Sequence, residues 1–87
     1  MIDDLIALRQ ELQTDASKQI SDDQFHAAMS AASRLLPFTD IEFAREIGTS
    51  RPTITRWVDG HTAPCPIMRP RVYRILLKYV EAALAGV

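Results

Sequence analysis

The sequence has little cysteine, glycine and proline, and it has no long apolar run. A single cysteine, Cys65, excludes an internal disulfide framework and a cysteine-based metal cluster. Three glycines and five prolines are too few for a disordered chain. No apolar run approaches the roughly 20 residues of a membrane span, and the acidic start, MIDDLIALRQ, lacks the basic residues of a signal peptide. We therefore expect a folded cytoplasmic protein without a membrane partner.

Residues in catalytic or cofactor-binding patterns are also lacking. The histidines, His26 and His61, have no serine or cysteine at a recognisable nucleophile spacing, and no glycine-rich phosphate loop occurs. Cys65 lies between two prolines, which is typical of an inert structural thiol, and His26 is expected at the surface or the core boundary. We predict no enzymatic activity, no metal and no cofactor. We also expect no small-molecule effector, because 87 residues leave no room for a ligand domain.

What the sequence does contain is helical periodicity along a single domain, residues 1–87. A hydrophobic share of 47% is enough for one thin core. Ser21 and Gln24 form a capping box at the start of one helix, and Pro37 marks its end. Helices are expected at about 3–13, 22–36, 40–47, 51–59 and 70–84, with a polar break at 14–21. The predicted fold class is an all-α compact bundle of about five helices.

The most specific local signals lie in the stretch DIEFAREIGTSRPTITRWVDG, residues 40–60. The residues that indicate where helices begin and end are Thr39 with Glu42, then Gly48, Ser50, Pro52 and Gly60. They supply a capping box, a glycine suited to positive φ, a second N-cap, a first-turn proline and a second terminal glycine. Burial is expected at Phe43, Ala44, Ile47, Ile54, Trp57 and Val58. The pattern predicts two short helices joined by a turn of about three residues.

This spacing resembles the helix-turn-helix of the lambdoid phage repressor and Cro group. The resemblance is carried by Ala44, Gly48, Ile54, Trp57 and the exit GHTAP at 60–64, and it covers about 27 of the 87 residues. The chain departs from the family pattern at Thr49, Pro52 and Val58-Asp59. The resemblance implies a lambda repressor-like, sequence-specific DNA-binding domain of a prokaryotic or phage-encoded protein, with a recognition helix at about 51–58.

A recognition helix points its N-terminal, outward residues at base edges in the major groove. The DNA-binding residues expected here are Ser50, Arg51, Pro52, Thr53, Thr55, Arg56 and His61. Arginine can donate a bidentate pair to guanine, and a threonine methyl can contact the methyl group of thymine. Ser50 and the free N–H groups at the helix start suit a phosphate, Pro52 offers only apolar contact, and His61 is a candidate for the DNA backbone.

Charge is divided unevenly along the chain, although its net value is only −1. Residues 1–50 contain nine acidic and four basic residues, whereas residues 51–87 contain two acidic and six basic ones. The six bases are Arg51, Arg56, Arg69, Arg71, Arg74 and Lys78. A half-basic domain suits DNA, because phosphate neutralisation supplies most of the sequence-independent affinity.

One recognition helix reads only a short half-site, so we predict a homodimeric repressor on an inverted repeat. Two apolar surfaces are candidates for the dimer interface: Leu5, Leu8 and Leu12 of the N-terminal helix within 1–20, or Tyr79, Leu84 and Val87. The three leucines look surplus to a thin core, which favours the first. The alternative function is a protein-interaction module on a helix-turn-helix scaffold, such as an antitoxin or anti-regulator, whose binding face would be the acidic half.

Overall fold

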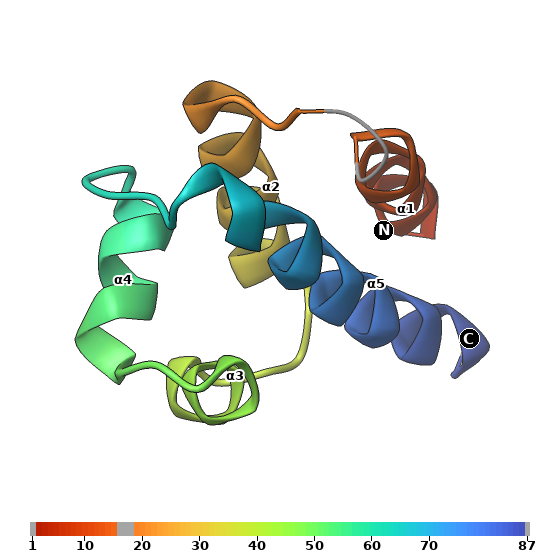
Figure 1. Cartoon of the computed structure of the whole chain (residues 1–87). Helices are drawn as coiled ribbons and strands as arrows, with labels where there is room; N and C mark the ends of the chain where they lie inside the picture. The colour runs from red at the N-terminus through yellow and green to blue at the C-terminus, as the bar shows by residue number, and fades with distance from the viewer. Residues whose placement is uncertain (1, 16–18, 87) are drawn as a thin grey trace.

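The chain is all-helical over the residues that the structure describes, 2–15 and 19–86. In this computed structural model the helices are α1 (Ile2–Asp15), α2 (Asp22–Leu35), α3 (Asp40–Ile47), α4 (Arg51–Asp59) and α5 (Arg69–Ala85), with a short 3-10 helix, η1 (Pro66–Met68), before α5 (Figure 1). No strand occurs in those two ranges. The radius of gyration, 11.9 Å, is that of one compact domain of this length. The prediction of an all-α compact fold with five helices is confirmed.

Local capping explains where α2, α3 and α4 begin. Ser21 and Gln24 form a reciprocal capping box at the start of α2, and Thr39 and Glu42 form the same arrangement at the start of α3. The Ser50 side chain accepts from the backbone N–H of Thr53 at the start of α4. Each contact satisfies backbone donors that have no partner inside the helix. These predicted caps are confirmed.

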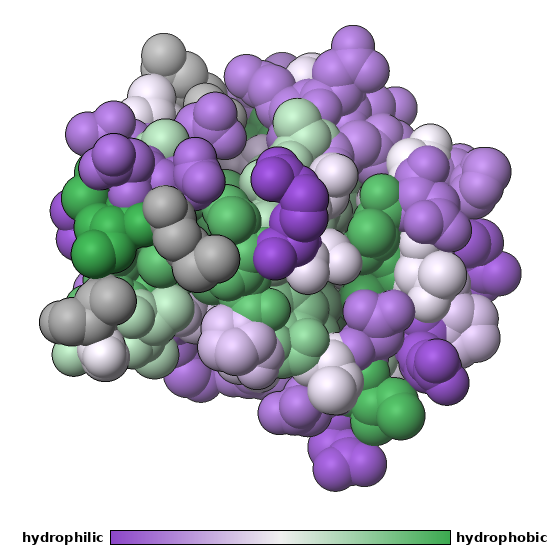
Figure 2. Space-filling view, turned by 180° about the vertical axis from the view of Figure 1, so that it is seen from behind, coloured by the Kyte–Doolittle hydropathy of each residue, from purple (hydrophilic) through white to green (hydrophobic). Residues whose placement is uncertain are grey.

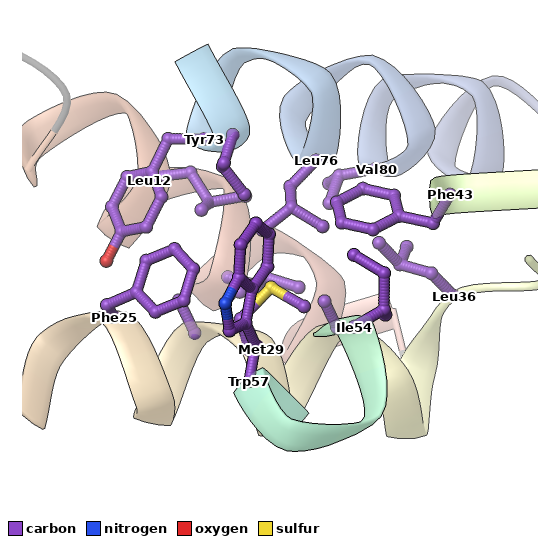
Figure 3. Close-up of a cluster of buried hydrophobic side chains, with 14 of the residues drawn as sticks. Leu12, Phe25, Met29, Leu36, Phe43, Ile54, Trp57, Tyr73, Leu76 and Val80 are labelled. Carbon is purple, nitrogen blue, oxygen red and sulfur yellow. The ribbon is translucent and has the colours of Figure 1, made fainter. Parts of the chain in front are cut away.

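The helices enclose a single core; α5 begins near the centre of the molecule and runs to the side on which α1 lies (Figure 1). α1 packs on α5 and on α2, while α4 packs on α2 and on α3. Figure 3 shows Phe25 and Met29 of α2 facing Tyr73, Leu76 and Val80 of α5, with side chains of α4 filling the space between them. α5 therefore joins the N-terminal helix to the α3–α4 pair through one continuous apolar cluster.

The leucines of α1 lie inside this core. Leu5, Leu8 and Leu12 are all buried within the chain itself, so the prediction that they are surplus to the core is wrong. The periodicity identified an apolar face correctly, but α5 and α2 of the same chain cover that face. In Figure 2, the view from behind, hydrophobic side chains gather toward the side on which α1 and the end of α5 lie. Ile2, 48% exposed, is the large apolar side chain that α1 leaves at the surface.

Arg69 is buried, and its side chain connects the start of α5 with two other segments of the chain. Only 7% of the residue is exposed. Its Nε donates to the carbonyl of Pro64 (2.9 Å), its Nη1 donates to the carbonyl of Ile20 (2.9 Å), and its Nη2 lies 2.7 Å from Oδ1 of Asp22. The guanidinium thereby links the start of α5 to the loop before it and to the entry of α2. Arg69 therefore does not belong to the basic surface that the charge distribution suggested.

Candidate functional site

α3 and α4 are joined by the three residues 48–50, and the joint has a defined geometry. Gly48 has φ +88°, in the left-handed region, and its N–H donates to the carbonyl of Ala44 (2.8 Å). The N–H of Thr49 reaches the same carbonyl (2.9 Å). Positive φ is costly for a residue with a Cβ atom, and this explains the glycine. The chain can therefore change direction within three residues and begin α4 at Arg51.

The inward face of α4 is fixed in the core. Ile54 is fully buried and Trp57 is 5% exposed. Figure 3 shows both side chains extending from α4 into the cluster, where the Trp57 ring meets Phe25 edge-on at 5.6 Å between ring centroids. The prediction that Trp57 belongs to the core is confirmed. Because this stripe sets the rotation of α4 about its axis, the residues on the opposite side face solvent.

Four of the predicted site residues lie together on that opposite side. Arg51, Pro52, Thr55 and Arg56 are all exposed and line one open surface hollow of about 420 Å³. We call it the α4 hollow. Neither Arg51 nor Arg56 forms a salt bridge with another of the described residues. The site therefore presents two arginine side chains beside a proline ring and a threonine.

The other three predicted site residues are placed differently. Ser50 is exposed, but its hydroxyl is used within the chain, where it lies 2.9 Å from Oγ1 of Thr53. Thr53 is only partly exposed. His61 is exposed beyond the end of α4, where its backbone N–H donates to the carbonyl of Arg56 (2.9 Å). None of the three lines the α4 hollow.

Thr55 connects the hollow to α3. Its Oγ1 hydroxyl lies 3.2 Å from Oδ2 of Asp40, the first residue of α3, and 3.2 Å from the carbonyl oxygen of Arg51 one turn earlier. A carboxylate oxygen and a backbone carbonyl oxygen are both acceptors, so the Thr55 hydroxyl is the donor in these contacts. Spacing along the chain gave no signal for Asp40, because the contact joins residues fifteen positions apart on different helices.

The last turn of α3 is in turn attached to α5. Oε1 of Glu46 lies 2.6 Å from Nζ of Lys78, and Oε2 accepts from the Tyr79 hydroxyl at 2.6 Å. The hydrogen bond from Lys78 is the main reason that the pKa of Glu46 is lowered, and the bond from Tyr79 adds to it. The Glu46 carboxylate raises the pKa of Tyr79 to about 12, with burial as the second cause. Lys78 is therefore engaged in an ion pair within the chain, although its side chain is 73% exposed.

His26 and Cys65 lie near the exit from α4. His26 is partly exposed, as predicted, and its Nε2 donates to the carbonyl of Thr62 (2.8 Å). Cys65 is free and exposed. Among the described residues no group of three histidine, cysteine or acidic side chains is placed to hold a metal ion. Within the same residues, no helix combines the length and the apolar character needed to cross a membrane.

Comparison of the chain with protein-family models, curated proteins and solved structures finds no match.

Proposed function

We propose that the chain is a sequence-specific DNA-binding transcriptional regulator in which α3 and α4 form a helix-turn-helix. One observation carries the proposal: Arg51 and Arg56 are exposed on the outward face of α4 and line the same hollow, and neither has an acidic partner among the described residues. An arginine without a partner inside the protein has all the N–H donors of its guanidinium group available for a ligand. Guanine edges and phosphate oxygens are the groups that such a fork binds in duplex DNA.

The contacts that hold α4 in place support the same proposal. Its inward stripe is locked in the core, its start is capped by Ser50, and Gly48 sets the turn from α3. An α-helix with its side chains is about 10–12 Å across, which suits insertion into a major groove about 12 Å wide. A recognition helix that is fixed in this way holds its side chains in the positions that base recognition requires.

A homodimer on an inverted repeat is the form of binding that we propose. Two turns of helix reach few base pairs, and the Asp40 carboxylate beside the α4 hollow reduces the local positive charge. A single copy should therefore bind weakly and lose affinity steeply as salt increases. Pairing presents two recognition helices about 34 Å apart, one turn of DNA. The leucines of α1 do not form the dimer interface, since the core of the same chain covers them.

Selection of duplexes from a random pool by the full chain tests the proposal directly. We expect enrichment of one motif with guanine in each half-site, repeated in inverted orientation about one helical turn apart. Sedimentation of the chain with and without the selected duplex reports the stoichiometry. A pool that stays unenriched after repeated rounds would contradict DNA recognition, and a single asymmetric motif would contradict the dimer alone.

A second candidate function is a protein-interaction module on the same scaffold. It is favoured by the exposed carboxylates of α1 and α2, which are Asp3, Asp4, Glu11, Asp22 and Asp23. Exposed carboxylates of this kind would bind a basic partner protein, as those of an antitoxin or an anti-regulator would. The two functions differ in what they require of α4. DNA binding uses Arg51 and Arg56, whereas a scaffold does not need them. An unenriched DNA pool together with salt-sensitive binding of a basic protein would favour this second candidate.

A further inference from the structure

The hydroxyl of Thr55 is occupied within the protein, although the residue lies on the exposed face of α4. A threonine side chain carries one O–H proton. Two acceptors of the same chain compete for that proton, Oδ2 of Asp40 and the carbonyl oxygen of Arg51, and both lie 3.2 Å from Oγ1. Thr55 therefore has no proton to donate to a ligand in the α4 hollow. The methyl group is the part of this side chain that is free of internal hydrogen bonds.

Helix geometry places this methyl-bearing residue between the two arginines. Successive residues of an α-helix are rotated by about 100°. Around the axis of α4, the order of the residues that line the hollow is therefore Arg51, Thr55, Pro52 and Arg56. The centre of the hollow combines a threonine with a proline ring, and an arginine stands on each side. An apolar spot between two guanidinium groups fits a base edge that carries a methyl group next to edges that carry acceptors.

We propose that the α4 hollow recognises the 5-methyl group of a thymine, and that Asp40 of α3 is a positioning residue for this readout. The inference rests on the proposed DNA-binding function and deepens it. In the major groove, thymine alone among the four standard bases presents a methyl group, whereas guanine presents two acceptors suited to arginine. By accepting the Thr55 proton, Asp40 keeps the hydroxyl from turning toward the DNA. The hollow then selects a thymine beside guanine-containing pairs.

Replacement of thymine by deoxyuridine removes the 5-methyl group and leaves the hydrogen-bonding edges of the base unchanged. In a duplex selected by the full chain, each thymine of the half-site is replaced in turn, and affinity is measured by fluorescence anisotropy. One position should lose affinity about fourfold, the value of about one buried methyl group. No loss at any position would overturn the inference while the DNA-binding function stands. A chain that selects no duplex would overturn both.

A matched pair of variants assigns the readout to Thr55. Thr55→Ser keeps the hydroxyl and removes the methyl group, so its affinity ratio between thymine and deoxyuridine should fall to about one. Thr55→Val keeps a methyl group in the same place and removes the hydroxyl, so its ratio should stay at about fourfold. Because each ratio compares two duplexes with one protein, it does not depend on the stability of the variant. An unchanged ratio in Thr55→Ser would overturn the assignment.

The role of Asp40 is tested through the same ratio. In Asp40→Ala the Thr55 hydroxyl loses one of its two acceptors, so we expect the preference for thymine over deoxyuridine to weaken toward one. Asp40→Asn retains an acceptor oxygen and should restore the preference. A merely structural loss in Asp40→Ala would weaken binding to both duplexes equally. Equal ratios in the wild-type chain and Asp40→Ala would overturn the positioning role.

Discussion

Nη2 of Arg69 lies 2.7 Å from Oδ1 of Asp22, forty-seven residues earlier in the chain. The two ends of this ion pair differ in exposure: the Arg69 side chain is 8% exposed, whereas that of Asp22 is 71% exposed. The guanidinium also donates to two backbone carbonyls, those of Ile20 and Pro64. Arg69 therefore stabilises the junction of α2 and α5, and the ion pair with the solvent-exposed Asp22 is the smaller part of that effect.

Replacement of Arg69 should destabilise the fold much more than replacement of Asp22. Arg69→Ala leaves two carbonyl groups without their donors, at a cost of about 2–4 kcal/mol. Asp22→Ala removes an exposed partner, at about 0–1 kcal/mol. Arg69→Lys should not restore stability, because one ammonium group lacks the planar fork that reaches all three acceptors. Urea unfolding of the three variants measures these differences, and an Arg69→Ala protein as stable as the wild type would refute the assigned role.

The contact between Glu46 and Tyr79 predicts a loss of stability in alkali. The pKa of Tyr79 is raised from 10.0 to about 12 in the folded chain, so the folded protein keeps a proton that the unfolded chain releases near pH 10. This contribution is fully present below pH 10 and is lost as the pH rises toward 12. In Tyr79→Phe this part of the pH dependence should be absent. Free energies of unfolding across the window decide it; identical slopes in the two proteins would contradict the prediction.

Gly48 permits a test of the turn between α3 and α4. A Cβ atom at this position would meet no atom within 4 Å, so an alanine would be strained only by its backbone conformation at φ +88°. Gly48→Ala should therefore cost about 1–2 kcal/mol. Gly48→Asn should cost less, because asparagine tolerates this conformation better. Thermal unfolding of the two variants measures the order, and an alanine variant more stable than the asparagine variant would reverse it.

The buried stripe behind α4 should control stability without changing sequence preference. Ile54→Ala leaves a cavity at a fully buried site and should cost about 2–5 kcal/mol. Ala44 of α3 is only 3% exposed, so Ala44→Leu adds volume at a packed site and should cost about 1–3 kcal/mol. Thermal melts report both losses, and duplex selection reports the preference. A variant with a normal melting temperature and a new preferred duplex would contradict the assignment of these residues to the core.

Local features of the fold were predictable because their causes lie within three or four residues of one another. The two capping boxes, the glycine ends of α3 and α4, and the N-cap Ser50 each join a side chain or a φ value to its nearest backbone groups. The outward face of α4 followed from the same periodicity that identified Ile54 and Trp57 as buried. Four of the seven residues predicted from the sequence line the α4 hollow, whereas Ser50, Thr53 and His61 do not.

Contacts between distant segments were not predictable in this way. Periodicity marks Leu5, Leu8 and Leu12 as one apolar face, but it does not tell whether the same chain or a second copy covers that face. Charge counting included Arg69 among the six bases of residues 51–87, and it could not tell that Arg69 is buried. Tyr73 of α5 is 1% exposed, and its hydroxyl donates to the carbonyl of Gln24 (3.1 Å), a contact between residues forty-nine positions apart. Val87, a predicted interface residue, lies outside the described residues.

The most direct test of the account compares the affinities of four proteins for a selected duplex and a scrambled one. The proteins are the wild-type chain, Arg51→Ala, Arg56→Ala and the control Arg34→Ala, whose exposed side chain lies with Asp4 and Glu11 between α1 and α2. We expect the α4 variants to lose about 1–3 kcal/mol on the selected duplex and less on the scrambled one, while the control changes neither. Equal affinities of all four proteins for the selected duplex would contradict DNA recognition by α4.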